Sequence, residues 1–94
     1  MRDAILALSA LVTALLACGM HQPVRGSFEQ NGLDRAAYEL GCPRSKLQLH
    51  GLNTPLDQPV ELGTQIGVEG CGQRAVYVFT QTGWLLNSQS TTAK

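Results

Sequence analysis

The first 17 residues limit the size of everything that can fold behind them. Residues 4–17 form an uncharged, strongly apolar run, and Arg2 adds positive charge ahead of it. A membrane-spanning helix needs about 20 apolar residues, whereas the apolar part of a secretory signal has about 7–15. The run therefore predicts a signal peptide over residues 1–17. Its removal leaves about 77 of the 94 residues, enough for one small domain that needs a covalent staple or similar support.

The predicted signal peptide ends in Leu-Leu-Ala at residues 15–17, and Cys18 follows directly. This order resembles the lipobox of bacterial lipoproteins, in which an aliphatic residue and a small residue precede a cysteine that becomes lipidated. The resemblance implies cleavage before Cys18 and acyl chains on Cys18, which would anchor the protein in a membrane. Gly19 stands where many lipoproteins retained at the inner membrane have Asp. The resemblance therefore implies the outer membrane, at its periplasmic face or the cell surface. Ordinary cleavage after Gly19 and an uncleaved anchor remain as alternatives.

The charge balance excludes two kinds of partner. The chain has seven Lys and Arg against seven Asp and Glu, without a basic run. Nucleic-acid binding needs a clustered basic face, and attraction to anionic lipid needs a polybasic segment. We therefore expect no nucleic-acid partner. Charged residues make up only 15% and there are ten glycines, a composition that favours turn-rich β structure.

One helix is predicted over residues 27–40. Ser27 and Gln30 match a capping box at its start. The apolar residues recur at helical spacing and form one face; they are Leu33, Ala36, Ala37 and Leu40. Gly32 weakens the first half by about 1 kcal/mol relative to alanine, so residues 33–40 are the firmest part.

The helix is expected to stop at Gly41, because glycine suits the left-handed cap and Pro43 follows two positions later. Beyond Pro43 the apolar period changes to two, which is typical of strands. Strands are predicted at residues 47–50, 60–68, 74–81 and 84–86. Residues 74–81 are apolar on both faces and are predicted to be the central strand.

These elements predict an α+β fold, with one helix packed on a three- to four-stranded antiparallel sheet. The predicted boundaries are a lipidated tether at 18–26, a folded domain at 27–88 and a flexible tail at 89–94.

Lipidation of Cys18 would leave Cys42 and Cys71 as an even pair in an oxidising compartment, which favours a disulfide between them. A redox centre is less favoured, because Cys42 follows a helix C-terminus, where the dipole opposes a thiolate. A zinc site would need four ligands at regular spacing, and the chain offers only these cysteines and two separated histidines.

Three short blocks occur in order: Leu-Gly-Cys-Pro at 40–43, Gly-Cys-Gly at 70–72, and Tyr77. In this respect the chain resembles small bacterial lipoproteins that are abundant in myxobacteria. The resemblance covers about residues 27–80 and implies location and fold, but no functional residue. Phe79 stands where such proteins often have a further cysteine, so no second disulfide is implied.

No catalytic, phosphate-binding or dinucleotide-binding motif is present in the sequence. We therefore expect a protein that is not an enzyme and holds no cofactor or metal. Tyr77 and Trp84 are the candidates for a binding patch, with core packing as the alternative. The functional hypothesis is a lipid-anchored binding or structural module of the cell envelope whose partner is an envelope protein or polymer. The alternative is an inhibitor or accessory subunit that docks a periplasmic enzyme through a sheet edge.

Overall fold

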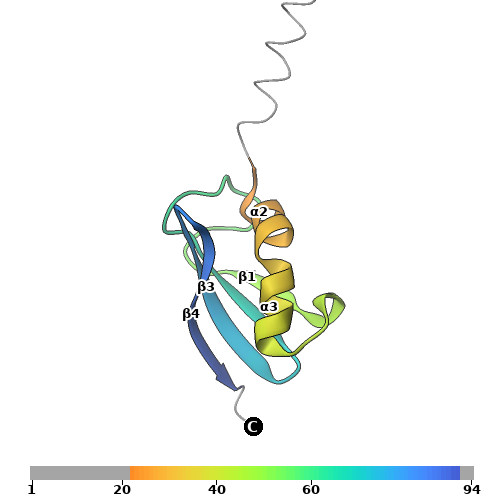
Figure 1. Cartoon of the computed structure of the whole chain (residues 1–94). Coiled ribbons are helices and arrows are strands. Elements are labelled where there is room, and N and C mark those ends of the chain that lie inside the picture. Colours follow the sequence, from red (N-terminus) through yellow and green to blue (C-terminus); the bar gives the residue numbers. More distant parts are fainter. Residues whose placement is uncertain (1–21, 92–94) are drawn as a thin grey trace, which may run out of the picture.

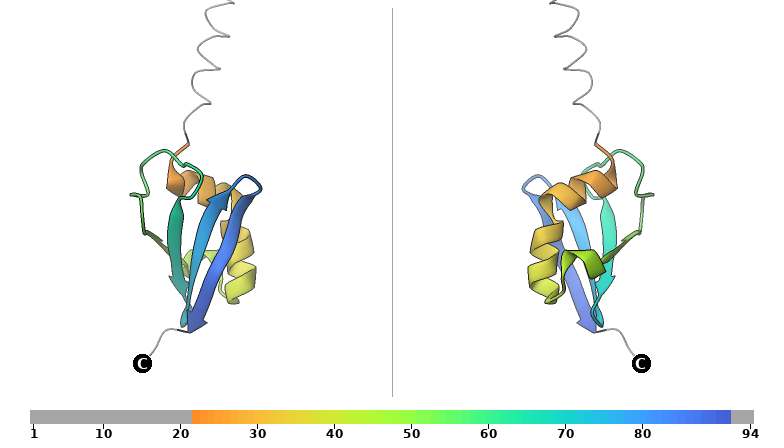
Figure 2. Two further views of the ribbon diagram at one scale, coloured as in Figure 1. Left: turned by 90° about the vertical axis from the view of Figure 1, so that its left-hand side faces the viewer. Right: turned by 90° about the vertical axis from the view of Figure 1, so that its right-hand side faces the viewer.

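The computed structural model describes residues 22–91 (Figure 1). The predicted signal peptide and Cys18 lie outside this range. Helices α2 (Val24–Asn31) and α3 (Leu33–Leu40) come first, followed by a short 3-10 turn, η1, at Arg44–Lys46. Both helices lie on the same side of one sheet (Figure 2).

The sheet has four antiparallel strands in the order β1-β2-β3-β4. Their bounds are Gln48–Gly51 for β1, Gln65–Gly70 for β2, Gln73–Thr80 for β3 and Gly83–Thr91 for β4. This arrangement confirms the predicted α+β fold of helix on antiparallel sheet. The prediction that 74–81 forms a central strand is also right, because β3 lies between β2 and β4.

The helical layer begins earlier than predicted. Pro23, not Ser27, is the N-cap residue, and Ser27 lies inside α2. The first helical N–H groups are satisfied by a distant loop: the amide of Val24 donates to Gln58 O (2.8 Å) and that of Arg25 to Leu56 O (3.0 Å). No side-chain cap is needed because these carbonyls replace it. The predicted C-terminal boundary of the tether at residue 26 is therefore wrong, because residues 24–26 already belong to α2.

The predicted single helix is broken at Gly32. A Cβ there would lie 2.6 Å from Cε1 of Phe28 and 3.2 Å from Cβ of Trp84. Real Cβ atoms do not approach so closely, so only glycine lets the backbone come this near to the core. The chain resumes as α3 and ends as predicted at Gly41, whose φ of 61° is left-handed.

Two strand predictions also need correction. Residues 60–64 form a loop and not the start of β2, because they follow Pro59 and turn at Gly63. Residues 89–91 belong to β4 and not to a tail, because backbone pairing with β3 extends to Gln73↔Thr91. The side chains on this part of β4 are polar, so an alternating hydrophobic pattern could not predict the strand here.

The predicted disulfide between Cys42 and Cys71 is present, with a Cα–Cα distance of 5.7 Å. It joins the end of α3 to the two-residue turn between β2 and β3. Cys71 and Gly72 both have positive φ (53° and 76°), as a tight hairpin turn of this hand requires. The bridge thus fixes the last turn of the helix layer to one end of the sheet.

Aromatic side chains fill the space between helices and sheet. Phe28 on α2 lies with its ring centroid 5.3 Å from those of Tyr77 and Trp84. Phe79 packs on the other side of Trp84 at 5.1 Å. Aliphatic side chains from both layers complete the core, and the most deeply buried are Val24, Ala36, Ile66 and Val68.

We predict that Cys42→Ala/Cys71→Ala lowers the free energy of unfolding by about 2–5 kcal/mol, because the unfolded chain is no longer closed into a loop. Urea unfolding of residues 19–94, followed by circular dichroism, measures the change. Reductant should weaken the unsubstituted protein by a similar amount and leave the double variant unchanged. Equal stability of the two proteins under oxidising conditions would contradict this role for the bridge.

Candidate functional site

The structure does not support a binding patch at Tyr77 and Trp84. Both side chains lie in the core, with exposed fractions of 0% and 2%. Their strand positions point toward the helices, which cover them. Of the other predicted site residues, Cys42 and Cys71 form the disulfide, and Cys18 lies outside the described residues.

Tyr77 and Trp84 each have a polar partner on a helix. The indole Nε1 of Trp84 donates to Oγ of Ser27 at 3.1 Å. The hydroxyl of Tyr77 donates to Oε1 of Glu39, and Arg35 Nε donates to the other oxygen of this carboxylate at 3.1 Å. Ser27 is therefore a buried acceptor rather than the predicted cap. These bonds satisfy the polar atoms of the core and need no catalytic explanation.

Burial raises the pKa of Tyr77 well above its ordinary value of 10.0, and the bond to Glu39 raises it further. The hydroxyl therefore stays protonated and donates over the whole physiological range. A tyrosine held in this way supports structure and is not available as a base.

The opposite face of the sheet is open and carries apolar side chains. Val78 on β3 pairs with Leu85 on β4, and Val76 lies two residues before Val78 on β3. All three side chains are half-buried and point away from the helices. We call this surface the outer face. No helix among residues 22–91 covers it, as the left-hand view of Figure 2 shows. The face of an antiparallel sheet that meets water normally carries polar side chains. The apolar side chains on the outer face therefore form a candidate interface.

A hollow of about 310 Å³ lies on the outer face above Gly67. Three polar side chains lie at its rim: those of His50, Glu69 and Arg74. The Glu69 carboxylate lies 3.5 Å from Nε2 of His50 and 3.7 Å from Nη2 of Arg74. The charges balance one another, and Leu52 closes the side near the loop. The hollow is thus a shallow apolar dent with a neutral polar border.

The sequence held a signal for this surface, because residues 74–81 are apolar on both faces. That pattern predicts a central strand, which β3 is, and does not say which face is covered. The structure buries Tyr77 under the helices and leaves its neighbours Val76 and Val78 toward the open side.

The β4 edge of the sheet is a second candidate. β4 lies at the edge, and it contains no charged residue and no proline. Such an edge can accept a further strand. A bulge at Asn87, which has no partner between Leu86 and Ser88, interrupts the regular pairing halfway.

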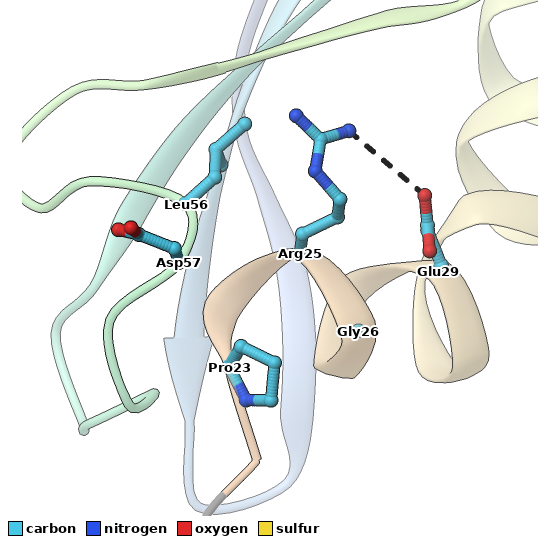
Figure 3. Close-up of a pocket in the computed structure, with 6 residues that line it drawn as sticks. All are labelled: Pro23, Arg25, Gly26, Glu29, Leu56 and Asp57. Atoms are coloured by element: carbon cyan, nitrogen blue, oxygen red, sulfur yellow. Dashed lines mark ion pairs between the residues drawn. The ribbon is translucent and has the colours of Figure 1, made fainter.

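A larger hollow, about 650 Å³, lies beside the start of α2. Figure 3 shows its lining from the helix and from the neighbouring loop, with Arg25 paired to Glu29 at 4.0 Å. The first N–H groups of α2 are already bonded to Leu56 O and Gln58 O, so they offer no site for an anion. Nothing in this lining combines a nucleophile with a base.

Within residues 22–91, no three His, Cys, Asp or Glu side chains are grouped so that they could hold a metal ion. None of the helices in this range is long and apolar enough to cross a membrane. No family model, no curated protein and no solved structure matches the chain.

We predict that the protein loses stability above about pH 10 and that Tyr77→Phe removes most of this loss. Because the folded pKa of Tyr77 exceeds the unfolded value of 10.0, its stabilisation is complete below pH 10 and declines as pH rises. The slope is about 1.4 kcal/mol per pH unit at most for one group. Urea unfolding at pH 8–11 gives the profile. Tyr38→Phe, at a tyrosine 88% exposed, is the control and should retain the decline. An unchanged profile in Tyr77→Phe would contradict the assignment.

Proposed function

We propose that this protein is a lipid-anchored module of the cell envelope that binds another envelope component through the outer face of its sheet. The observation that carries the proposal is the open apolar surface around Val76, Val78 and Leu85. Lipidation at Cys18 supplies the anchor, at the outer membrane. The protein acts by binding and not by catalysis.

The make-up of the outer face supports an interface. Protein interfaces combine an apolar centre, depleted of charge, with a polar rim. Here the two valines and the leucine form the centre, and the balanced group of His50, Glu69 and Arg74 lies at the border. Because the rim carries both signs, it favours a specific partner over general attraction to a charged polymer.

The sequence supports the anchor. The apolar run has the length of a signal, and Leu-Leu-Ala-Cys at 15–18 resembles a lipobox. Several acyl chains on one cysteine hold a protein stably at a membrane, whereas one chain binds only reversibly. Anchoring would concentrate the small domain beside its partner.

An inhibitor or accessory subunit that docks a periplasmic enzyme is the second candidate. The neutral, proline-free edge of β4 favours it, because a strand of the partner could extend the sheet there. The bulge at Asn87 would limit such pairing to one half of the strand.

We predict that Cys18→Ser abolishes acyl labelling and leaves uncleaved precursor, because the thiol is the site of lipid attachment. Metabolic labelling with a fatty-acid analogue and the electrophoretic mobility of the protein test this. Cys71→Ser is the matched control, since it also removes one thiol but should still be labelled. Unlabelled, soluble wild-type protein would contradict the anchor.

We predict that a photo-crosslinking amino acid at Val76 captures one envelope component in cells, whereas the same group at Tyr38 captures none. Tyr38 is exposed on α3, on the other side of the molecule from the outer face, so it controls for random collision. The captured species is identified by mass spectrometry. Capture from Asn87 alone would favour the β4 edge. Equal capture from Val76 and Tyr38, or none from Val76, would contradict the proposal.

A further inference from the structure

Two large apolar side chains are exposed on one loop. Among residues 22–91, the strongly exposed large hydrophobic residues are Tyr38, Leu52 (51%) and Leu62 (61%). Leu52 and Leu62 both belong to the segment 52–64 between β1 and β2. Leu52 borders the hollow of the outer face, whereas the core and the outer face do not account for Leu62.

The loop holds Leu62 firmly at a turn. The amide of Thr64 donates to Glu61 O (3.0 Å), and the amide of Glu61 donates back to Oγ1 of Thr64 (3.2 Å). Gly63 has a φ of 89° and donates to Phe79 O on β3 (2.8 Å). The second central position of such a turn needs a positive φ, but the first accepts most residues. An exposed leucine there is not required by the turn itself.

The same loop is fastened to the point where the chain enters the domain. The amide of Val60 donates to Gln22 O (3.0 Å), and Pro23 and Pro59 form an isolated bridge. Figure 1 shows the loop beside the start of α2, at the end of the domain opposite the C-terminus. The hollow of Figure 3 lies between these same two segments.

Only three residues separate Cys18 from Gln22. A fully extended chain covers at most about 3.6 Å per residue, so Gln22 would lie within about 14 Å of the lipidated cysteine. The end of the domain that carries the loop must then lie close to the bilayer surface.

We infer that the loop 52–64 rests on the bilayer in which Cys18 is anchored, with Leu62 entering the headgroup region and Leu52 at the border of the contact. The inference rests on the lipid anchoring proposed above. The same loop carries two exposed acidic residues, Asp57 and Glu61, which anionic lipid would repel. The surface that fits is therefore a zwitterionic one.

The mature lipoprotein in vesicles of phosphatidylcholine containing doxyl-phosphatidylcholine as quencher tests the contact. An environment-sensitive fluorophore is attached to a cysteine placed at Gln58, an exposed loop position, after the native disulfide has formed. The comparison position is Ser90, exposed near the far end of β4. Quenching is expected several-fold stronger at Gln58 than at Ser90. Equal quenching at the two positions overturns the inference.

Leu62→Asp then separates the leucine contact from simple closeness. In this variant, quenching at Gln58 should fall markedly, and Tyr38→Asp, which removes an exposed apolar group elsewhere, should leave it unchanged. For the protein with Leu62 intact, replacing half of the phosphatidylcholine by phosphatidylglycerol should also weaken the quenching at Gln58. Unchanged quenching in Leu62→Asp overturns the inference while acyl labelling of Cys18 preserves the proposed anchor. Absence of acyl label together with absence of vesicle binding overturns both.

Discussion

The disulfide between Cys42 and Cys71 is the constraint on which the arrangement depends. Helices α2 and α3 have eight residues each, too short to be stable alone in water. They persist because both ends of the helical layer are fastened. The bridge holds the end of α3 to the β2–β3 turn, and carbonyls of the loop 52–64 hold the start of α2. Between these points Phe28 packs against Tyr77 and Trp84.

Fastening the helices to one face leaves the other open. The helical layer supplies hydrogen-bond partners for the polar atoms of Tyr77 and Trp84, so this face of the sheet forms the core without unsatisfied side-chain polar groups among the described residues. The outer face receives no such cover from residues 22–91, yet it still carries Val76, Val78 and Leu85. If the end of the domain that carries the loop 52–64 rests on the membrane, the strand axes lie roughly perpendicular to the bilayer, given their direction in Figure 2. The outer face would then point sideways, toward components anchored in the same membrane.

Features that local chemistry decides were predicted well from the sequence. Gly41 and Pro43 end a helix by their own backbone preferences. The predicted pairing of Cys42 with Cys71 is also present. Features that depend on distant partners were missed. Val24 begins α2 because carbonyls more than thirty residues away accept its amide and the next, and β4 reaches Thr91 because β3 pairs with it. Alternation assigned Tyr77 and Val76 to opposite faces, but it could not tell which face the helices would cover.

Peptide mapping without reduction tests the central constraint most directly. Cleavage after Lys and Arg should release residues 36–44 and 47–74 as one species joined through Cys42 and Cys71, which separates into two peptides after reduction. The structure predicts this linked species as the dominant form of the protein purified from an oxidising compartment. Recovery of the two peptides as separate species with free thiols would contradict it, and the helical layer would then need another attachment to the sheet.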